Sequence, residues 1–548
     1  MTSNSDRVLS HEPVYHWEEF VENLEGYCSG GYHPTHLGDI FYGRYRVMHK
    51  LGYGSYSTVW LARDLEEHRN VALKILVAGQ SQASTEAQIL RALNAGDKNH
   101  PGYSFICRLL DEFWFDGPNG RHRCLVLRAT GCSVSDSQDD SNEFPIHVAR
   151  SMSAQALLGL SYIHSCSFVH GDLHKGNLLF ERPELESWTE AEVVQNLGEA
   201  EKEPVRRRDG QSHGPEAPDY CVPLGRIGMR SDRLPENTRI TISDFGQSFL
   251  ATEDHDALQT PRKVAPPEHF FKGHLGPPAD VWTLGLSIYE ILSTRSLFET
   301  YFPDPDTIIS EMVDTLGRPP QCWWDSWANK QNFYAEDGSR IGEPPTPLST
   351  RLKEREGEIG DEEQKSLEQL YRGKRSEEGE VLSGGMLEYE PSKRMTADEA
   401  LMSDWMIRWA RPDFEKCVAG EQEDVPQSSV EKLDQPVASS FTVEDINDDN
   451  EVAGRSRHFP DSEDSLNLIN AKDASLSDAA RNKSSTASIA GGAMDFGYSS
   501  GNDNVNDVAL SDTAHNGRAV VSAAGGMKSC DGSGGDCGAG GLSPNEVE

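Results

Sequence analysis

The stretch that most constrains the fold is His-Gly-Asp-Leu-His-Lys-Gly-Asn at residues 170–177. A helical apolar pattern over residues 146–163 precedes it and a short apolar run, residues 178–180, follows it, which predicts a helix, a loop and a strand. Asp172 could face a hydroxyl while the amide oxygen of Asn177 holds Mg²⁺, as phosphoryl transfer requires. A turn between a helix and a strand also favours Gly, Asp and Asn, so this spacing alone leaves both interpretations open.

A pair of glycines, Gly52 and Gly54, stands between two stretches of alternating apolar and polar residues in the segment 45–62. The alternation predicts two strands, and the glycines predict a hairpin between them. A glycine backbone can approach a phosphate closely, but a tight turn is the more common role of such a pair. Ser57 stands where a third glycine would complete the phosphate-binding pattern.

One lysine, Lys74, lies within the apolar strand predicted at residues 71–76. A lysine there is costly unless it is paired or extends to an edge of the sheet. Glu86, in a helical pattern over residues 85–93, is the carboxylate that we expect to pair with it. In the functional interpretation, the paired lysine holds nucleotide phosphates.

The later patterns divide this region into a strand-rich and a helix-rich part. Residues 107–115 and 123–129 are strand-like runs joined by strong turn residues at 116–120. A small, mainly antiparallel lobe is therefore predicted to end near residue 130. From there to about residue 410 the apolar spacing is mostly helical.

Three segments lack the pattern of a core. Residues 1–43 contain glycines and a proline and predict an arm or loop rather than a helix. Residues 181–238 are charged and proline-rich, so we expect a surface insertion, with a short helix at residues 188–197. From residue 411 to 548, Ser, Gly, Asp and Asn dominate, which predicts a disordered low-complexity tail.

Net charge and cysteine spacing limit the function classes. The net charge of −38 disfavours nucleic acid as a direct ligand and favours a basic peptide partner. None of the ten cysteines forms a CxxC pair, and no Cys/His cluster has zinc-finger spacing. No apolar run is long enough for a membrane span, so we expect a soluble intracellular protein of the cytoplasm, the nucleus or both.

Three motifs follow the insertion. Asp244-Phe245-Gly246 directly follows a strand predicted at residues 239–243, and Pro-Pro-Glu ends at Glu268. Asp280 begins a strongly apolar helix. With the glycine hairpin, the strand lysine, the helix glutamate and the 170–177 loop, these motifs in this order resemble the eukaryotic protein kinase family over residues 45–410.

Further residues point to one group within the protein kinase family. Residues 30–64, GGYHPTHLGDIFYGRYRVMHKLGYGSYSTVWLARD, are similar to the N-terminal segment of SR-protein kinases, which phosphorylate Arg/Ser-rich splicing factors. The combination of HGDLHKGN, DFGQSF and PPE resembles a fungal-type branch of that family. The fold implied is α+β and bilobal: a mainly antiparallel β N-lobe with one helix at residues 44–130 and a mainly α C-lobe at residues 131–410.

The activity implied is that of an ATP-dependent serine/threonine protein kinase that uses ATP and Mg²⁺ and acts on Ser in Arg/Ser-rich proteins. We expect protein substrates, Arg/Ser-rich basic peptides among them, and a monomer that binds neither nucleic acid directly nor a membrane. One alternative is a catalytically weak or inactive scaffold with a kinase fold. Another is a small-molecule phosphotransferase, because aminoglycoside and choline kinases also carry HGDLHxGN.

Site residues carry over position by position. Asp172 would orient the substrate hydroxyl and accept its proton, and Asn177 and Asp244 would hold Mg²⁺. Glu268 would pair with Arg394, and Asp280 would brace the catalytic loop. The residues implied around ATP are Leu51, Gly52, Gly54, Val59, Ala72, Lys74 with its partner Glu86, and the hinge Arg128, Ala129 and Thr130, with Leu127 as gatekeeper.

Several positions depart from the family pattern. Gly171 replaces the arginine that normally binds a phosphate on the activation loop, so we expect activity without that phosphate. His174 replaces the lysine that usually contacts the γ-phosphate, and Ala265 replaces an arginine beside the substrate. Four acidic residues could form a docking groove for Arg-rich peptides, or simply a solvated helix end: Asp304, Asp306, Glu311 and Asp314.

Overall fold

The computed structural model describes most of the chain up to residue 423, within one compact unit. The tail predicted from residue 411 lies outside the described residues from residue 424 onward. The described ranges are 12–138, 143–225, 234–255, 257–293, 295–300, 303–353, 358–375 and 381–423.

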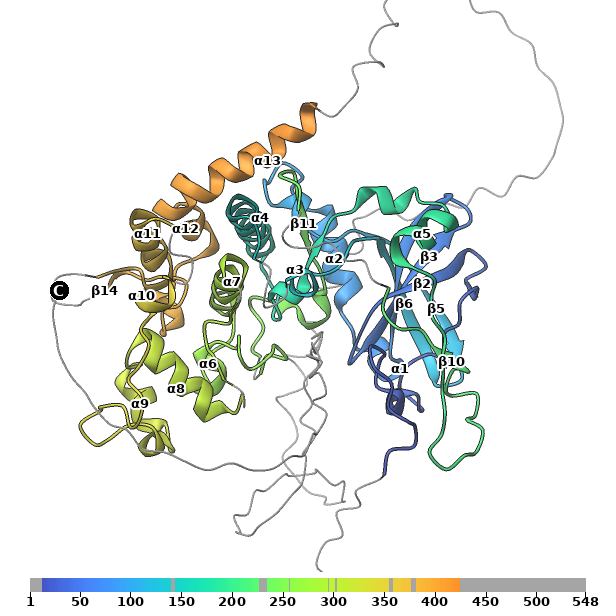
Figure 1. Cartoon of the computed structure of the whole chain (residues 1–548), viewed down its shortest axis with the longest axis horizontal. Coiled ribbons are helices and arrows are strands. Elements are labelled where there is room, and N and C mark those ends of the chain that lie inside the picture. Colours follow the sequence, from blue (N-terminus) through green and yellow to red (C-terminus); the bar gives the residue numbers. More distant parts are fainter. Residues whose placement is uncertain are drawn as a thin grey trace, which may run out of the picture. The chain divides into compact units, whose positions relative to one another are not determined.

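The N-lobe (Figure 1) is built on one six-stranded antiparallel sheet. Its strand order is β1-β2-β3-β4-β6-β5. The two predicted hairpins are confirmed, because β2 pairs with β3 across the glycine turn and β5 pairs with β6. The strands are β1 (Ile40–Phe41), β2 (Tyr45–Gly54), β3 (Ser57–Asp64), β4 (Arg69–Leu76), β5 (Leu109–Gly117) and β6 (Gly120–Arg128).

The two faces of this sheet differ. In register, Lys74 lies opposite Val59 of β3 and Leu125 of β6, so these side chains share one face. Their neighbours Trp60 and Leu73 point to the other face, where they belong to a fully buried cluster. Helix α1 (Ala78–Ser81) and helix α2 (Glu86–Ala95) follow β4, and α2 is the helix predicted to carry Glu86.

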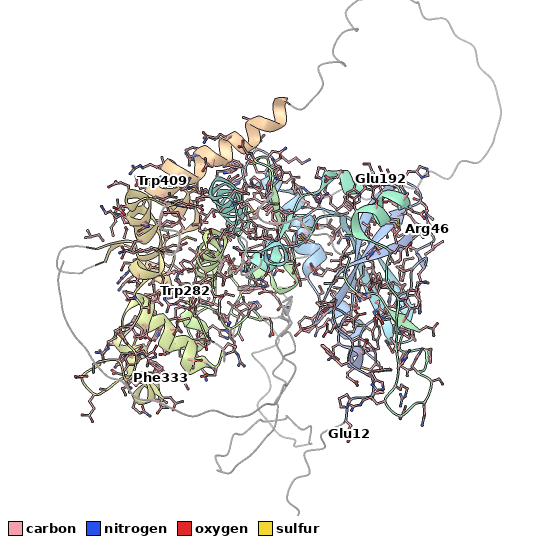
Figure 2. The ribbon with its side chains drawn as sticks, viewed as in Figure 1. Glu12, Arg46, Glu192, Trp282, Phe333 and Trp409 are labelled. Atoms are coloured by element: carbon pink, nitrogen blue, oxygen red, sulfur yellow. The ribbon has the colours of Figure 1, made fainter. Side chains whose placement is uncertain are left out.

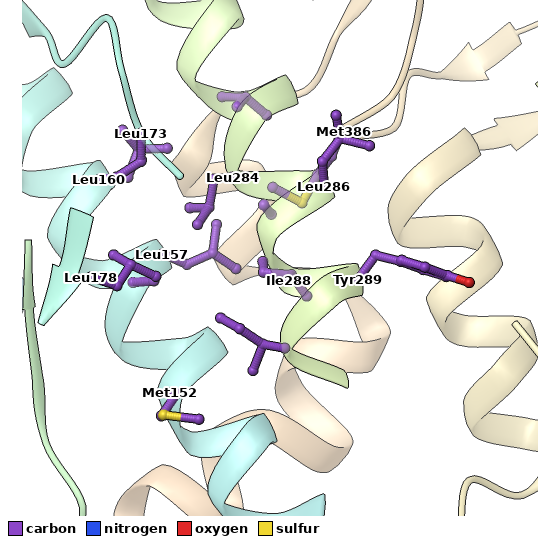
Figure 3. Close-up of a cluster of buried hydrophobic side chains, with 14 of the residues drawn as sticks. Met152, Leu157, Leu160, Leu173, Leu178, Leu284, Leu286, Ile288, Tyr289 and Met386 are labelled. Atoms are coloured by element: carbon purple, nitrogen blue, oxygen red, sulfur yellow. The ribbon is translucent and has the colours of Figure 1, made fainter. Parts of the chain in front are cut away.

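The C-lobe is helical, as predicted, and its core lies between α4 and α7. Figure 3 shows Leu157 and Leu160 of α4 facing Leu284 and Ile288 of α7, with Leu173 of the 170–177 loop beside Leu160. The helices are α3 (Val134–Ser137), α4 (Ile146–Ser165), α6 (Pro267–Phe270), α7 (Pro277–Leu292), α8 (Pro305–Leu316), α9 (Gln321–Ser326), α10 (Leu348–Arg351), α11 (Asp361–Arg372), α12 (Ala397–Leu401) and α13 (Arg411–Glu423). Within the described ranges, none of the helices combines the length and the apolar character that crossing a membrane would require.

Short strand pairs hold the 170–177 loop in place at both ends. Before the loop, β7 (Phe168–Val169) pairs with β12 (Phe249–Leu250). After it, β8 (Leu178–Phe180) pairs with β11 (Ile240–Ile242). The loop is also anchored in the middle, because Leu173 is fully buried in the core.

The insertion at residues 181–238 is not confined to the surface, which corrects the expectation. Its helix α5 (Glu190–Leu197), predicted within residues 188–197, begins at a Thr189–Glu192 capping box. Val193 and Leu197 of this helix are buried in one cluster with Leu61 of β3 and Ala129 of the hinge. The charged, proline-rich composition suggested a surface segment because only a few apolar residues make these buried contacts. The insertion also contains a 3₁₀ turn (Pro183–Glu186) and the paired strands β9 (Glu203–Pro204) and β10 (Tyr220–Cys221).

The N-terminal arm packs against the second half of this insertion. Over residues 12–43 its only helical element is a 3₁₀ turn, Leu24–Gly26, in agreement with the prediction of an arm. Tyr15 forms a backbone bridge with Arg207. One buried cluster joins the arm and the insertion: Tyr15, Val21, Leu24, Tyr27, Tyr32, Val77, Val205, Ala217 and Cys221.

Helix α13 extends the C-lobe to Glu423, so the predicted boundary at residue 411 is too early. It contacts α4 (Figure 1) and buries Cys417. Asp413 lies 3.4 Å from Arg150 of α4, and Phe414 packs edge-on against Phe105. The polar composition of the helix hid these few contacts. A hairpin of β13 (Lys374–Arg375) and β14 (Val381–Ser383) completes the described elements.

Candidate active site

Lys74 lies between two carboxylates that come from different parts of the chain. Its Nζ donates to Glu86 Oε1 at 2.7 Å and to Asp244 Oδ1 at 2.8 Å. Burial alone would lower the pKa of Lys74, but Asp244 and Glu86 outweigh burial and raise it above its usual value. The lysine is therefore a fixed positive charge on the inner face of the sheet.

Asp244 begins the Asp-Phe-Gly turn in a left-handed backbone conformation, with φ of 60°. The neighbouring Phe245 is fully buried in the C-lobe core and anchors this turn. Burial opposes ionisation of Asp244, but pairing with Lys74 prevails and lowers its pKa. The Asp244 side chain is nevertheless 48% exposed, so its carboxylate remains accessible to a cation.

Asp280 of α7 holds the backbone of the 170–177 loop. Asp280 is almost fully buried and accepts hydrogen bonds from the backbone N–H of His170 at 2.7 Å and of Gly171 at 2.9 Å. The ring of His170 bonds the carbonyl of Ser243 at 3.0 Å, which ties the loop to the Asp-Phe-Gly turn. Burial lowers the pKa of His170, so this contact is made by the neutral ring.

Asp172 and Asn177 face each other inside the loop. The Asn177 amide donates to the carbonyl of Asp172 at 2.8 Å, which leaves the amide oxygen of Asn177 for a cation. Among the described residues Asp172 Oδ1 is buried without a well-formed hydrogen bond, and the ring of His174 lies 3.5 Å from it. Burial raises the pKa of Asp172, and the nearby His174 opposes this effect.

His174 faces Asp172, whereas Lys175 does not. His174 Nδ1 accepts the N–H of Gly176 at 3.0 Å, so its ring proton lies on Nε2, which is 3.5 Å from Asp172 Oδ1. Gly176 makes room for the ring, because a Cβ there would lie 2.7 Å from His174 Cε1. Lys175 instead approaches Gln138 at 3.3 Å and Glu290 at 3.4 Å.

The structure explains why residue 171 is a glycine. Its φ is +78°, a conformation that side chains disfavour, and an added Cβ would lie 2.5 Å from the carbonyl oxygen of Gln247. An arginine would therefore not fit at this position. The start of the activation segment is held without it, because Ser248 donates to the His170 carbonyl at 2.9 Å.

The residues expected around the nucleotide lie along one face of the N-lobe sheet. Gly52 pairs in register with Val59, and Ala72 pairs with Leu127. Leu51 is partly buried against the cluster that holds Ala129 and α5. Of the other hinge residues, Arg128 is bound to Glu186 of the insertion at 2.5 Å, and Thr130 is partly exposed.

The pair expected between Glu268 and Arg394 is present and fully buried. Arg394 Nη1 and Nη2 donate to the two Glu268 oxygens at 2.7 and 2.8 Å. The guanidinium lies 5.0 Å from the ring centre of Trp282, whose place in the C-lobe Figure 2 shows. The pair ties the segment after the activation loop to the region before α12.

Of the four acidic residues at α8, Asp304 is exposed at the N-cap position, so this end of the helix is solvated. Each carboxylate is bonded within the protein, where it caps the helix or holds the segment that follows it. The bonds run from Thr307 N to Asp304 (3.1 Å), from Trp327 Nε1 to Asp306 (2.7 Å), from Arg351 to Glu311 (2.8 Å) and from Tyr334 Oη to Asp314 (2.7 Å).

Sequence reasoning missed two contacts between the N-terminal arm and the glycine hairpin. The arm residue Tyr32 donates its hydroxyl to the carbonyl of Gly54 in the glycine hairpin at 2.8 Å. Lys50 of the same hairpin is fully buried and pairs with Glu22 of the arm. A second lysine in an apolar strand, at residue 50, was the available signal for the latter.

The fold and this arrangement define a protein kinase domain. The model of the protein kinase domain family matches residues 45–188 and 232–406, and so omits most of the insertion. A serine/threonine protein kinase of Aspergillus fumigatus is 28% identical over 392 residues, covering 70% of this chain and 90% of the relative.

Two further relatives are named for their kinase group. The serine/threonine-protein kinase SRPK of Physarum polycephalum is 28% identical over 412 residues, covering 70% of this chain and 91% of the relative. SRSF protein kinase 3 of Homo sapiens is 38% identical over 168 residues, 30% of each chain. The chain belongs to the protein kinase family and, within it, to the SR-protein kinases.

Proposed function

We propose that the chain transfers the γ-phosphoryl group of ATP to serine or threonine hydroxyls of protein substrates. The observation that carries this proposal is Lys74, held at once by Glu86 of α2 and Asp244 of the Asp-Phe-Gly turn. Protein kinases require the lysine–glutamate pair and the turn aspartate to be in place together. Here the lysine–glutamate pair is formed, and Asp244 lies beside the lysine.

The nucleotide would lie against the inner face of the sheet. Lys74 would contact its phosphates, the Gly52–Gly54 hairpin would cover them, and Val59 and Ala72 would pack on the adenine. The backbone of the hinge Arg128–Thr130 would hold the adenine edge. Asn177 and Asp244 offer hard oxygen ligands that suit Mg²⁺, which would neutralise charge on the phosphates.

Asp172 would act on the substrate hydroxyl. Its carboxylate would accept the hydroxyl proton while the hydroxyl oxygen bonds to the γ-phosphorus and the bond to ADP breaks. Asp280 keeps the loop rigid through two backbone bonds, so little reorganisation is needed at the moment of transfer. His174, not Lys175, is the loop side chain that lies beside this carboxylate.

Arg/Ser-rich proteins are the substrate class that we propose. The names of SRSF protein kinase 3 and SRPK support this choice, and the net charge of −38 favours basic peptides. The α8 carboxylates are already bonded internally, so they do not form a ready docking site. We further expect a monomer located in the cytoplasm or the nucleus.

Activity without activation-loop phosphorylation is part of the proposal. Gly171 leaves no arginine to bind such a phosphate, and the segment is anchored by β7–β12 pairing and Ser248 instead. Phosphatase treatment of the active protein should leave turnover within about twofold. Loss of turnover after that treatment would overturn this part.

The experiment is a transfer assay with the full chain, Mg-ATP labelled at the γ-phosphate and an Arg/Ser-repeat peptide. Label should enter the peptide, and Asp172→Asn should reduce the rate about 10²–10⁴-fold because the acceptor of the hydroxyl proton is lost. Asp116→Asn, the same change at an exposed position near the end of β5, is the matched control and should leave the rate unchanged.

Other outcomes distinguish the alternatives. Binding of ATP without transfer to any peptide would favour an inactive scaffold. Transfer only to small alcohols such as choline would favour a small-molecule phosphotransferase. An equal rate in wild type and Asp172→Asn would refute the role proposed for the aspartate.

A further inference from the structure

The glycine hairpin of the N-lobe is held at its tip by a side chain from outside the sheet. Gly54, the last residue of β2, accepts a hydrogen bond from the hydroxyl of Tyr32 at 2.8 Å. Tyr32 belongs to the N-terminal arm, 22 positions earlier in the chain. The residues expected around ATP do not include this tyrosine, so its contact with the hairpin is a separate observation.

Tyr32 is itself rigidly placed, with only 6% of its surface exposed. Its ring lies against Gly26, where an added Cβ would come within 2.4 Å of Tyr32 Cε2. Its backbone carbonyl accepts a hydrogen bond from the Asn119 amide at 2.6 Å, and the same amide bonds Glu216 of the insertion at 2.7 Å. The hydroxyl therefore acts from a fixed point formed by the arm, the β5–β6 turn and the insertion.

The hydroxyl keeps its proton, as this contact requires. Burial, together with the neighbouring carboxylate Glu22 and Tyr53, raises the pKa of Tyr32 to about 12. A carbonyl oxygen offers no proton, so the bond exists only while the hydroxyl donates. Tyr32 is consequently a constant donor to Gly54 at neutral pH.

Fixing the Gly54 carbonyl also fixes the next N–H. The peptide that joins Gly54 to Ser55 is planar, so the Ser55 N–H points opposite to the carbonyl that Tyr32 holds. The space around Gly54 is open, because an added Cβ would meet no atom within 4 Å. Backbone N–H groups of glycine-rich turns are suitable donors to phosphate oxygens.

We propose that Tyr32 is a positioning residue for ATP, which orients the Gly54–Ser55 peptide so that the Ser55 N–H is ready to bind a nucleotide phosphate. This inference rests on the proposed function and deepens it. The arm thereby contributes to nucleotide affinity without touching the nucleotide. Tyr32 acts through the hairpin, so its loss should weaken ATP binding more than it slows transfer.

The test is Tyr32→Phe in the full chain, which removes only the hydroxyl. The KM for ATP should rise about 3–10-fold, as expected for the loss of one hydrogen bond, while kcat stays within about twofold. The Kd for a fluorescent Mg-ATP analogue should rise by the same factor. Tyr45→Phe is the matched control: Tyr45 is also buried and lies on β2, but its hydroxyl bonds Asp111 at 2.9 Å, at the far end of the strand from the hairpin.

Three outcomes decide the matter. An unchanged Kd in folded Tyr32→Phe, or an equal rise in Tyr45→Phe, would overturn the inference while wild type still binds and transfers. A wild-type protein that binds no nucleotide would instead overturn the proposed function. Gly26→Ala displaces the Tyr32 ring but keeps its hydroxyl, so it should raise the Kd as Tyr32→Phe does. It replaces Tyr32→Phe in the test if Tyr32→Phe does not fold.

Discussion

Two buried lysines on opposite faces of the N-lobe sheet show how similar residues serve different ends. Lys74 on β4 meets Glu86 and Asp244 on the face where the nucleotide is proposed to bind. Lys50 on β2 meets Glu22 of the arm and lies 5.1 Å from the ring centre of Trp60. Both are lysines in apolar strands with a glutamate partner.

The difference lies in what else can reach the ammonium group. Lys74 shares Asp244, whose side chain is 48% exposed, so its surroundings are open to a ligand. Lys50 and Glu22 are 0% and 1% exposed, so no ligand can enter. A buried pair open on one side can serve catalysis, whereas a closed pair can only stabilise or specify the fold.

The largest expected effect on the rate is on the face where the nucleotide is proposed to bind. Lys74→Met should lower kcat/KM for transfer to an Arg/Ser-repeat peptide by about 10²–10³-fold, because the positive charge at the phosphates is lost. Lys50→Met is the matched control and should retain most of the turnover per folded molecule. Steady-state kinetics on both variants checks this. Equal losses of kcat/KM in the two variants would show that the two lysines do not differ in their importance for transfer.

The largest expected effect on stability is on the face where Lys50 and Glu22 are closed off from solvent. Lys50→Met should lower the free energy of unfolding by about 3–5 kcal/mol, because the buried Glu22 carboxylate loses its counter-charge and keeps only the Tyr27 hydroxyl as a partner. Urea unfolding followed by tryptophan fluorescence measures the change. The double variant Lys50→Met with Glu22→Leu should regain much of the loss, since no unpaired charge remains. No recovery in the double variant would indicate that the pair stabilises the fold by itself.

A smaller effect is expected beside Asp172. His174→Leu should reduce kcat about tenfold with an unchanged KM for ATP, because the ring N–H facing Asp172 Oδ1 is lost. His174→Gln should retain most of the activity, since its amide can place a donor near the same point. Initial rates at saturating peptide test this. A KM effect without a kcat effect would assign His174 to nucleotide binding instead.

The smallest effect is a pH dependence on the arm side. Burial, with His122 and His36, lowers the pKa of His33 to about 3, whereas an unfolded histidine titrates near 6.5. Below pH 6.5 this histidine therefore binds a proton in the unfolded chain but not in the folded one. Its contribution to stability is complete above pH 6.5 and falls as the pH drops toward 3. Between pH 6.5 and 5.5 the loss should be about 1 kcal/mol.

Replacement of this histidine isolates its contribution. His33→Phe should remove about 1 kcal/mol of the difference in unfolding free energy between pH 6.5 and 5.5, measured by urea unfolding. His16→Phe, at an exposed position of the same arm, should leave the difference intact. An unchanged pH dependence in His33→Phe would show that His33 is not the group responsible.

The sequence predicted the elements that local patterns determine. Alternation predicted β2 and β3, a nearly continuous apolar run predicted β4, helical spacing predicted α4, and a strongly apolar stretch predicted α7. Motif order placed Lys74, Asp172, Asn177 and Asp244 in one kinase domain. The roles of these residues stay predictions until the assays are done. Their proximity follows from the fold, because Lys74 and Asp244 are 170 positions apart yet 2.8 Å from each other.

The rest depends on contacts without a local pattern. Asn70 of β4 donates to the carbonyls of Leu185 and Trp188, more than a hundred positions later, and so ties the insertion to the sheet. Val193 and Leu197 stand at i and i+4, a weak signal of a buried helix face that the charged surroundings outweighed. Helix α13 was missed for the same reason, because a few residues such as Cys417 carry its packing.

The position of the insertion also has a consequence for synthesis on the ribosome. Val222 completes the buried cluster on the outer face of the N-lobe sheet, but the last strand of that sheet ends at Arg128. Synthesis proceeds at about 5–20 residues per second, so Val222 is made roughly 5–20 seconds after the last strand of the sheet. During this interval the apolar outer face of a newborn N-lobe is exposed to chaperones and to other nascent chains.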